Sequence, residues 1–429
     1  MRGITGGIPM SDAQTPIGPE DRFLPVFGQQ AFETDSPSAT SSRAGQFLAM
    51  GTYSFGDEQQ AVDVRDDAEN LGVPFVEPTS DDHSLWQEQR YLDDLTRFAL
   101  QDHGVSDPRD WIPGAPTRPD DELALWQNVA STHAATSLLA LLNYSLGSVY
   151  ELQRVAAASA LTAYSGGRLD RANAILIEAV GSTDDHVSQV AAATLGVDRD
   201  RTALRDTDFG APPERMMEAE PRAEVSVAIH GTWAQVSSDP WYAPGQPLHD
   251  HIRSTSTKNL YHDTTYFTWS GEYSQEARDL GASKLITWRS LHNLTSFDTV
   301  FAHSHGGNVA LTSAADGELI RLLVLMHTPA LPRLDEQWAA IRSRVARVMV
   351  MRTRLDHVVL ADGFKNGSKQ RFDQSKLPHE PFVLHWAQKD AWFSHSFFTE
   401  LDTWTKYKIA DAVIREHAYV GNLAVPTPI

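Results

Sequence analysis

The chain has 429 residues, of which 41% are hydrophobic and 21% are charged, with a net charge of −20 and no cysteine. This composition is typical of a soluble globular protein, and the length favours two domains. So acidic a surface argues against binding to nucleic acid or to an anionic membrane, and a chain without cysteine forms no disulfide and no thiolate metal site.

The N-terminal segment shows no recognisable targeting signal. Residues 1–20 are rich in Gly, Pro, Ser and Thr and are predicted to be disordered. Residues 1–22 lack the apolar core of a secretory signal, and no apolar run in the chain reaches the length of a membrane span. We therefore expect a cytoplasmic protein without an integral membrane segment.

Residues 21–208 are predicted to form a helical N-terminal domain. Residues 20–80 are weakly periodic and include a predicted Ser/Thr/Pro-containing loop at 35–42. Apolar residues at helical spacing predict a helix near 84–99, and three prolines interrupt the pattern before a strongly helical stretch at 122–142.

A short internal repeat lies within this helical region. The segment 142–161 resembles 177–196, and its Val-Ala-Ala-Ala at 155–158 recurs 35 residues later. Each copy predicts a helix, a short polar turn and an Ala-rich second helix. Two interpretations stay open, a HEAT-like pair of repeats at about 139–197 and an ordinary helical bundle with an Ala-rich face.

A Pro- and charge-rich linker is predicted at 209–224, and strands alternate with helices beyond it. The predicted strands are 225–229, 264–269, 299–302, 321–326, 345–351 and 381–384. The predicted helices are 274–293, 308–315, 334–344 and 397–417. This alternation predicts an α/β domain over 225–429 with a doubly wound, mostly parallel sheet, whose functional side chains lie beyond the carboxyl ends of the strands.

The segment around Ser304 has the features of a nucleophile elbow. Apolar residues predict a strand that runs into Ala302-His303-Ser304-His305-Gly306, and a helix-forming run follows. A serine at such a turn has a strained backbone, so small residues are needed two positions before and after it. Here they are Ala302 and Gly306, which gives A-x-S-x-G in place of the usual G-x-S-x-G. We predict Ser304 as the nucleophile.

A nucleophilic serine needs a base and an acid that orients the base. His395 lies between the last predicted strand and the last predicted helix and is the preferred base; His379 and His385 fit that place less well. Asp356 follows the strand at 345–351 and is the preferred acid, with Asp362 as the alternative.

The oxyanion formed by acyl transfer needs backbone N–H donors. One is expected from His305, the residue after the nucleophile. The other is expected from Thr232 or Trp233, because His230-Gly231 directly follows the strand at 225–229. His230 itself is expected to pack beneath this loop.

These segments, in this order, resemble the lipase- and esterase-like members of the α/β-hydrolase superfamily. The resemblance covers about residues 222–429 and implies a Ser304–His395–Asp356 triad. It predicts a serine hydrolase that cleaves a carboxylic ester without a cofactor or a metal site. Two alternatives stay open, cleavage of an amide or peptide bond, and a non-enzymatic scaffold in which a hydrolase-like module docks on the helical region.

The long stretch between Trp233 and Phe267 shows no clear secondary structure and is predicted to be a lid or binding loop. An apolar acyl pocket is predicted from four aromatic residues, Trp241, Tyr242, Trp269 and Trp392. The expected substrate is a small-molecule or lipid ester, and the helical region could bind a protein partner.

Overall fold

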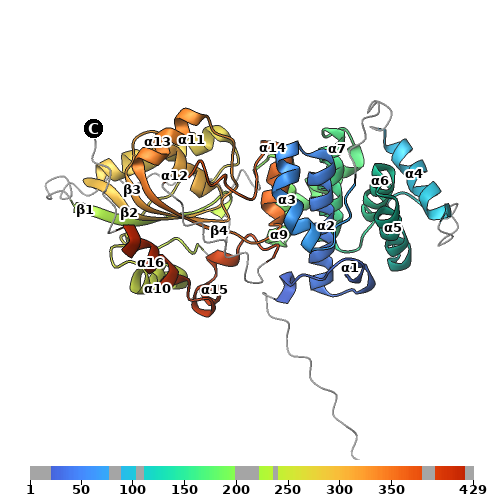
Figure 1. The fold of residues 1–429 in the computed structure, drawn as a ribbon, viewed down its shortest axis with the longest axis horizontal. Coiled ribbons are helices and arrows are strands. Elements are labelled where there is room, and N and C mark those ends of the chain that lie inside the picture. The colour runs from blue at the N-terminus through green and yellow to red at the C-terminus, as the bar shows by residue number, and fades with distance from the viewer. Residues whose placement is uncertain are drawn as a thin grey trace, which may run out of the picture.

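The computed structural model describes residues 21–76, 88–102, 111–198, 222–234, 240–378 and 392–420. The chain is mixed α/β with a parallel sheet (Figure 1). We call residues 21–198 the helical half and residues 222–420 the sheet half. The predicted disorder at 1–20, residues 209–221 of the predicted linker, the strand at 381–384, and His379 and His385 lie outside the described residues. The last three residues of the predicted linker, 222–224, belong instead to the first strand of the sheet (Arg222–Ile229).

Helices are the elements of the helical half, apart from a short 3-10 turn at Asp21–Phe23. They are α1 (Gln30–Glu33), α2 (Pro37–Phe55), α3 (Glu58–Asn70), α4 (Gln89–Asp102), α5 (Pro119–Thr132), α6 (Ala135–Ser145), α7 (Glu151–Ser165), α8 (Asp170–Val180) and α9 (Asp185–Leu195).

Helical structure begins earlier than the sequence pattern indicated. The predicted loop at 35–42 is wrong, because Ser36 caps α2 through a bond from the Ala39 N–H (3.1 Å) and Pro37 occupies the first helical turn. Serine followed by proline is a helix-start signal as well as a loop signal. The predicted continuous helix over 122–142 is also interrupted, since His133 adopts a left-handed backbone (φ 52°) between α5 and α6.

The internal repeat corresponds to two successive helix pairs, α6–α7 and α8–α9. Ser159 and Thr194, which are 35 residues apart, hydrogen-bond to each other at 2.7 Å, so the Ala-rich helices of the two copies meet at equivalent positions. Small residues also let α7 approach α2, because a Cβ on Gly51 would lie 2.8 Å from that of Ala160. A HEAT-like origin of these pairs stays a prediction.

Among the described residues, the sheet has four parallel strands in the order β1-β2-β3-β4. These are β1 (Arg222–Ile229), β2 (Leu294–His303), β3 (Ile320–Met326) and β4 (Val345–Met351). One face is covered by α11 (Gln275–Leu291), α12 (His305–Ala315) and α13 (Asp335–Arg344). The other is covered by α10 (Pro247–Thr255), α15 (Leu401–Lys406) and α16 (Ile409–Val420) (Figure 1). Each face has its own hydrophobic cluster, and the prediction of a parallel α/β sheet is confirmed.

Three predicted elements of the sheet half differ from the structure. Residues 264–269 form no strand but an irregular segment, from which Phe267 and Trp269 pack into the core. The closing helix is divided into a 3-10 turn (Phe397–Thr399), α15 and α16, with Lys408 in a left-handed conformation (φ 52°) between the last two. The stretch after Trp233 contains α10 and is therefore not a structureless loop.

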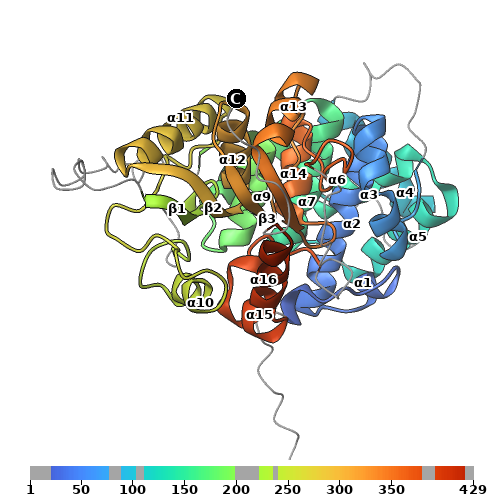
Figure 2. The ribbon, with the colours of Figure 1, turned by 60° about the vertical axis from the view of Figure 1, so that its left-hand side comes forward.

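The helix after β4, α14 (His357–Asn366), packs among the helices of the helical half rather than on the sheet. It contacts α2, α7 and α9, and Figures 1 and 2 show it beside them. One hydrophobic cluster contains Leu355, Val358 and Ala361 of the sheet half together with buried residues of those three helices. The two halves therefore share a core at the carboxyl edge of the sheet.

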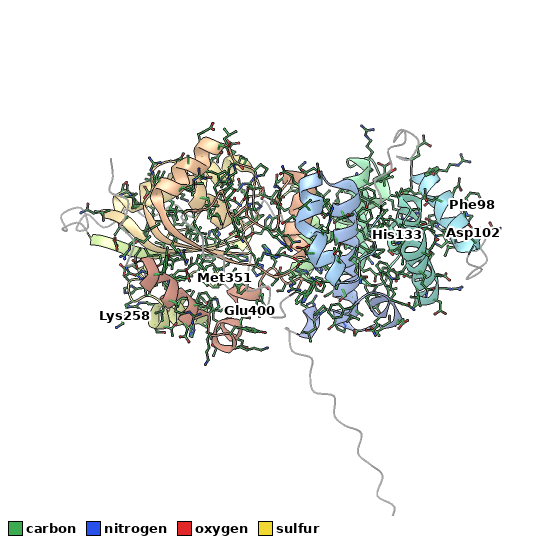
Figure 3. The ribbon with its side chains drawn as sticks, in the orientation of Figure 1. Phe98, Asp102, His133, Lys258, Met351 and Glu400 are labelled. Atoms are coloured by element: carbon green, nitrogen blue, oxygen red, sulfur yellow. The ribbon has the colours of Figure 1, made fainter. Side chains whose placement is uncertain are left out.

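This joint lies close to the middle of the molecule. Figure 3 marks Met351, the end of β4, and Phe98 and Asp102 on α4 at the far end of the helical half. Among the helices of the described residues, none is both long and apolar enough to cross a membrane.

Candidate active site

Ser304 occupies the turn between β2 and α12. Its backbone has φ 52° and ψ −136°, a conformation that non-glycine residues rarely adopt. The N–H of Ser304 donates to the carbonyl of Met326 at the end of β3 (2.8 Å), which holds the turn against the neighbouring strand. This is the strained strand–turn–helix geometry that a nucleophile elbow requires.

Close packing around Ser304 explains the small residues on either side of it. A Cβ on Gly306 would lie 2.3 Å from the carbonyl oxygen of His230, and one on Gly231 would lie 2.6 Å from the Ser304 Cβ. Both glycines are therefore needed where the β1 loop passes the elbow. Ala302 lies within β2 and pairs with Ile229 and Leu325, where its methyl group is accommodated.

The structure brings Ser304, His395 and Asp356 into one hydrogen-bonded line. His395 Nδ1 lies 2.8 Å from Asp356 Oδ2, and His395 Nε2 lies 3.0 Å from Ser304 Oγ. A carboxylate only accepts hydrogen bonds, so Nδ1 carries the proton and Nε2 can accept the hydroxyl proton of Ser304. All three residues are buried, with 2 to 5% of their surface exposed.

Hydrogen bonds between two segments of the chain place His395 beside Asp356. The N–H of Phe393 donates to the Arg354 carbonyl (2.8 Å), and the Thr353 hydroxyl donates to the Ser394 carbonyl (2.9 Å). His395 is thereby placed beside the segment that follows β4, although the two segments are far apart in the sequence.

Asp356 is held by four hydrogen bonds to its carboxylate. Oδ1 accepts the N–H groups of Val358 (3.0 Å) and Val359 (3.2 Å), which makes Asp356 the N-cap of α14. Oδ2 accepts from His395 and also from His327 Nδ1 (2.9 Å). Burial alone would raise the pKa of Asp356, but the two imidazoles hold it well below its usual range, so the acid stays ionised.

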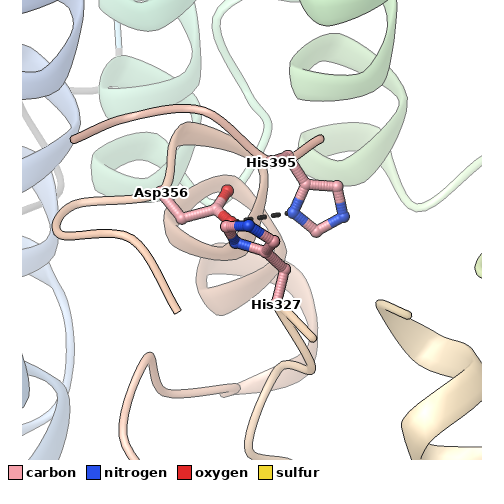
Figure 4. Close-up of side chains that lie close together, drawn as sticks. All are labelled: His327, Asp356 and His395. Carbon is pink, nitrogen blue, oxygen red and sulfur yellow. Dashed lines mark hydrogen bonds and ion pairs between the residues drawn. The ribbon is translucent and has the colours of Figure 1, made fainter. Parts of the chain in front are cut away.

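His327 is a site residue that the sequence did not reveal. It directly follows β3, with a left-handed backbone (φ 51°), and burial lowers the pKa of its ring. Its position at the carboxyl end of a strand was the available signal. Figure 4 shows His327 and His395 converging on the Asp356 carboxylate. The ligand atoms of these three residues lie within 4.8 Å of one another, so among the described residues they form the group that could hold a metal ion.

The backbone hydrogen bonds near Ser304 reduce the number of candidate donors for the predicted oxyanion hole. The N–H of Trp233 already donates to the carbonyl of Gly271 (2.9 Å), which removes Trp233 from the two alternatives. Thr232 is the remaining candidate, since no backbone bond between described residues uses its N–H. His305 is the first residue of α12, where an N–H has no partner within the helix.

His230 and Trp269 are fully buried and support the loop after β1. His230 Nε2 accepts the Trp269 N–H (3.3 Å), and the Trp269 indole donates to the His230 carbonyl (2.8 Å). Burial lowers the pKa of His230 to about 4, so its ring is neutral. This position agrees with the prediction that His230 packs beneath the loop after β1. The prediction that Trp269 lines an acyl pocket is wrong, because its side chain is fully buried in the core.

Asp362, the alternative acid, does not approach His395. It lies six residues after Asp356, within α14, and accepts from His305 Nε2 (3.2 Å) and Asn366 Nδ2 (2.8 Å). The Tyr273 hydroxyl also donates to it. These partners, His305 foremost, hold the pKa of Asp362 below its usual value against the effect of burial.

The other predicted substrate-binding aromatics lie at different distances from the nucleophile. Trp241 packs edge-on against the ring of His303, the residue before Ser304, with 6.5 Å between ring centroids. Tyr242 packs on His230 at 4.5 Å. Trp392 lies under the Arg354 guanidinium at 5.0 Å and belongs to the core shared by the two halves. All three side chains are buried.

No family model, no curated protein and no solved structure matches this chain. The function is therefore inferred from the geometry of the site and from the chemistry that its residues support.

Proposed function

We propose that the protein is a serine hydrolase of α/β-hydrolase type that cleaves a carboxylic ester. The observation that carries this proposal is the unbroken line from Ser304 Oγ to His395 (3.0 Å) and from His395 to Asp356 (2.8 Å), with Ser304 on a strained turn. The chain order of nucleophile, acid and histidine is the order of that fold class.

In this mechanism Ser304 attacks the ester carbonyl while His395 Nε2 accepts the hydroxyl proton. Asp356 keeps Nδ1 protonated and stabilises the imidazolium that forms. His395 then returns the proton to the leaving alcohol, which leaves the acyl group on Ser304. A water molecule next attacks the acyl group while His395 accepts a proton from it. His395 finally returns this proton to Ser304 as the carboxylic acid is released.

The negative charge on the carbonyl oxygen is stabilised by the N–H groups of His305 and Thr232 in this proposal. His305 begins α12, so the positive end of the helix dipole also faces the developing charge. One donor of this kind is worth about a hundredfold to a thousandfold in kcat in other enzymes.

The test is covalent labelling of the purified protein by a fluorophosphonate, with Ser304→Ala as the matched control. We expect labelling of the wild type and none of the variant. We also expect hydrolysis of a short p-nitrophenyl ester to fall by roughly a thousandfold or more in the variant. Equal turnover by both proteins would refute the assignment of Ser304.

Absence of labelling in the wild type would favour the non-enzymatic alternative. Turnover of a p-nitroanilide faster than the ester would favour the amide alternative.

A second candidate rests on the proximity of His327, Asp356 and His395, which could bind a divalent metal. A metal ion there would take His395 Nδ1 from Asp356, and hydrolysis would then depend on the ion. Incubation with a chelator separates the two candidates: we expect unchanged ester hydrolysis, whereas loss that zinc restores would favour the metal site.

A further inference from the structure

Helix α3 of the helical half presents a buried polar stripe to the sheet half. The stripe consists of Gln60, Asp63 and Asp67, whose spacing of three and four residues places them on one face of the helix. Burial of two carboxylates is costly unless they have partners. Their partners lie in the segment 352–371, which carries Asp356.

Asp63 binds the backbone of this segment. Its Oδ2 accepts the N–H of Gln370 (2.5 Å) and its Oδ1 accepts the N–H of Arg371 (3.1 Å). The Gln370 side chain then accepts the N–H of Asp356 through Oε1 (3.0 Å). Two hydrogen-bonding steps therefore connect the Asp63 carboxylate to the backbone of the triad acid.

The rest of the stripe holds both sides of the same segment. Asp67 pairs with Arg352 (3.2 Å) and Arg371 (3.0 Å), which lie before and after Asp356 in the chain. The Gln60 amide donates to the carbonyl of Gly363 on α14 (2.8 Å). The acid-bearing segment is thus fixed to the helical half at its start, along its helix and at its end.

We infer that Asp63 is a positioning residue, which holds Asp356 in line with His395 through Gln370. This inference rests on the proposed function, because it needs Asp356 to act as the triad acid. It assigns the helical half a part in completing the active site, since the two hydrogen bonds that lead through Gln370 to the Asp356 N–H begin at Asp63 on α3.

A carboxylate suits this position because each of its oxygens can accept one N–H. Asparagine has a single acceptor oxygen, and its amide group would face the second N–H without bonding to it. Asp63→Asn therefore removes one of the two bonds while changing the side-chain volume little. A small misplacement of a catalytic group can cost up to about a hundredfold in rate.

The experiment compares kcat and KM for a short p-nitrophenyl ester in the full-length variants Asp63→Asn and Gln370→Met. The matched control is Asp66→Asn, which lies on the same helix and pairs with Arg371 (3.3 Å) but is largely exposed and bonds to no backbone group of that segment. We expect Asp63→Asn to lower kcat about ten- to hundredfold with KM within twofold, and Asp66→Asn to match the wild type. Fluorophosphonate titration at saturation counts the competent sites, so a misfolded fraction is not mistaken for a slower step.

The double variant Asp63→Asn/Gln370→Met tests whether Asp63 acts through Gln370. We expect it to be no slower than Gln370→Met alone, because the second bond is then already lost. Multiplied losses, a wild-type kcat in Asp63→Asn, or equal losses in Asp63→Asn and Asp66→Asn would overturn the inference while the proposed function stands. Full activity in Ser304→Ala would overturn the proposed function, and this inference with it.

Discussion

The candidate site contains two histidine–aspartate pairs, whose aspartates lie at the start of α14 and within it. The two pairs differ in their other hydrogen-bond partners. His395 pairs with Asp356 at the N-cap of α14 (2.8 Å), and His305 pairs with Asp362 further along the helix (3.2 Å). Both pairs are buried, and each histidine belongs to the immediate surroundings of Ser304. Residue types alone would give the two pairs the same function.

Their remaining partners distinguish them. In the first pair, His395 Nε2 faces the Ser304 hydroxyl (3.0 Å). In the second pair, the other ring nitrogen of His305 accepts from the Asn308 amide (3.3 Å), and Tyr273 and Asn366 also donate to the carboxylate. The first pair therefore contacts a hydroxyl that can react, whereas the second contacts only groups that do not react; we call the second pair closed. The proposed base is therefore distinguished by a ring nitrogen that can accept the Ser304 hydroxyl proton, and not by the aspartate–histidine contact.

The largest predicted effect separates the two aspartates. Asp356→Asn should lower kcat for a short p-nitrophenyl ester by roughly a thousandfold to ten thousandfold, because the neutral amide no longer holds His395 in the required tautomer. Asp362→Asn should lower it by no more than about tenfold, since Asp362 bonds to the side chain of His305 and not to the backbone N–H that is the proposed oxyanion donor. The reverse order would make the second pair the catalytic one.

The next prediction concerns the aromatic residues on the two sides of the elbow. Trp241 packs on His303 beside the nucleophile, whereas Tyr242 packs on His230 beneath the β1 loop. Trp241→Ala should lower kcat/KM for medium-chain esters by roughly ten- to hundredfold and leave acetate esters little changed, because an acyl chain would lose apolar contact area.

Tyr242→Ala is the matched control for that measurement. We expect it to affect medium-chain and acetate esters equally, because His230 supports the loop that carries Thr232. Equal losses on both substrates in Trp241→Ala would show that the tryptophan also supports the loop and does not select the acyl chain.

His327 offers a way to weaken the first pair without removing it. His327→Phe removes one of the two imidazole donors to Asp356 Oδ2 and keeps an aromatic ring in its place. We expect kcat to fall about tenfold with KM unchanged, a loss of about 1.4 kcal/mol in transition-state stabilisation. His327→Gln retains a donor and should lose less. A loss as large as that in Asp356→Asn would mean that His327 itself contacts the reacting groups.

The features predicted from the sequence are those fixed by local contacts. The elbow and the loop after β1 were predicted because a strained turn and a close backbone approach demand Ala302, Gly306 and Gly231 at set positions. The strands β3 and β4 were predicted almost to the residue because each is a largely apolar run, interrupted by one arginine, in a sheet covered on both faces.

The features that the sequence did not resolve depend on contacts between distant segments. Asp356 and Asp362 lie on the same helix, and only the folded chain shows which histidine each one meets. His327 was one of 17 histidines, and its position directly after a strand did not show that its ring would reach Asp356. The polar stripe of α3 is bound to residues about 300 positions away, as in the contact of Asp63 with Gln370, so its buried side could not be identified from hydrophobic periodicity.

The smallest predicted effect tests the charge of the second pair. Burial lowers the pKa of His305 from its usual value near 6.5, so on acidification the unfolded chain binds a proton at this ring at a higher pH than the folded protein does. The unfolded state then binds more protons than the folded state, and the free energy of unfolding falls on acidification. One such group contributes a slope of at most about 1.4 kcal/mol per pH unit.

His305→Gln should therefore give a shallower dependence of the free energy of unfolding on pH than the wild type, in urea titrations between about pH 6.5 and 5. Burial raises the pKa of Asp63 to about 6, which gives a slope of the opposite sign between about pH 4 and 6. Asp63 is present in both proteins, however, so its contribution cancels in the comparison. The variant is expected to be less stable at pH 7, because glutamine loses the edge-on contact of the His305 ring with Tyr273 (5.6 Å between ring centroids), and the difference from the wild type should narrow as the pH falls. A steeper slope in the variant than in the wild type would mean that His305 already carries its second proton in the folded protein, because the folded state would then bind more protons than the unfolded state. The second pair would then be an ion pair and not the neutral, closed hydrogen bond that distinguishes it from the first.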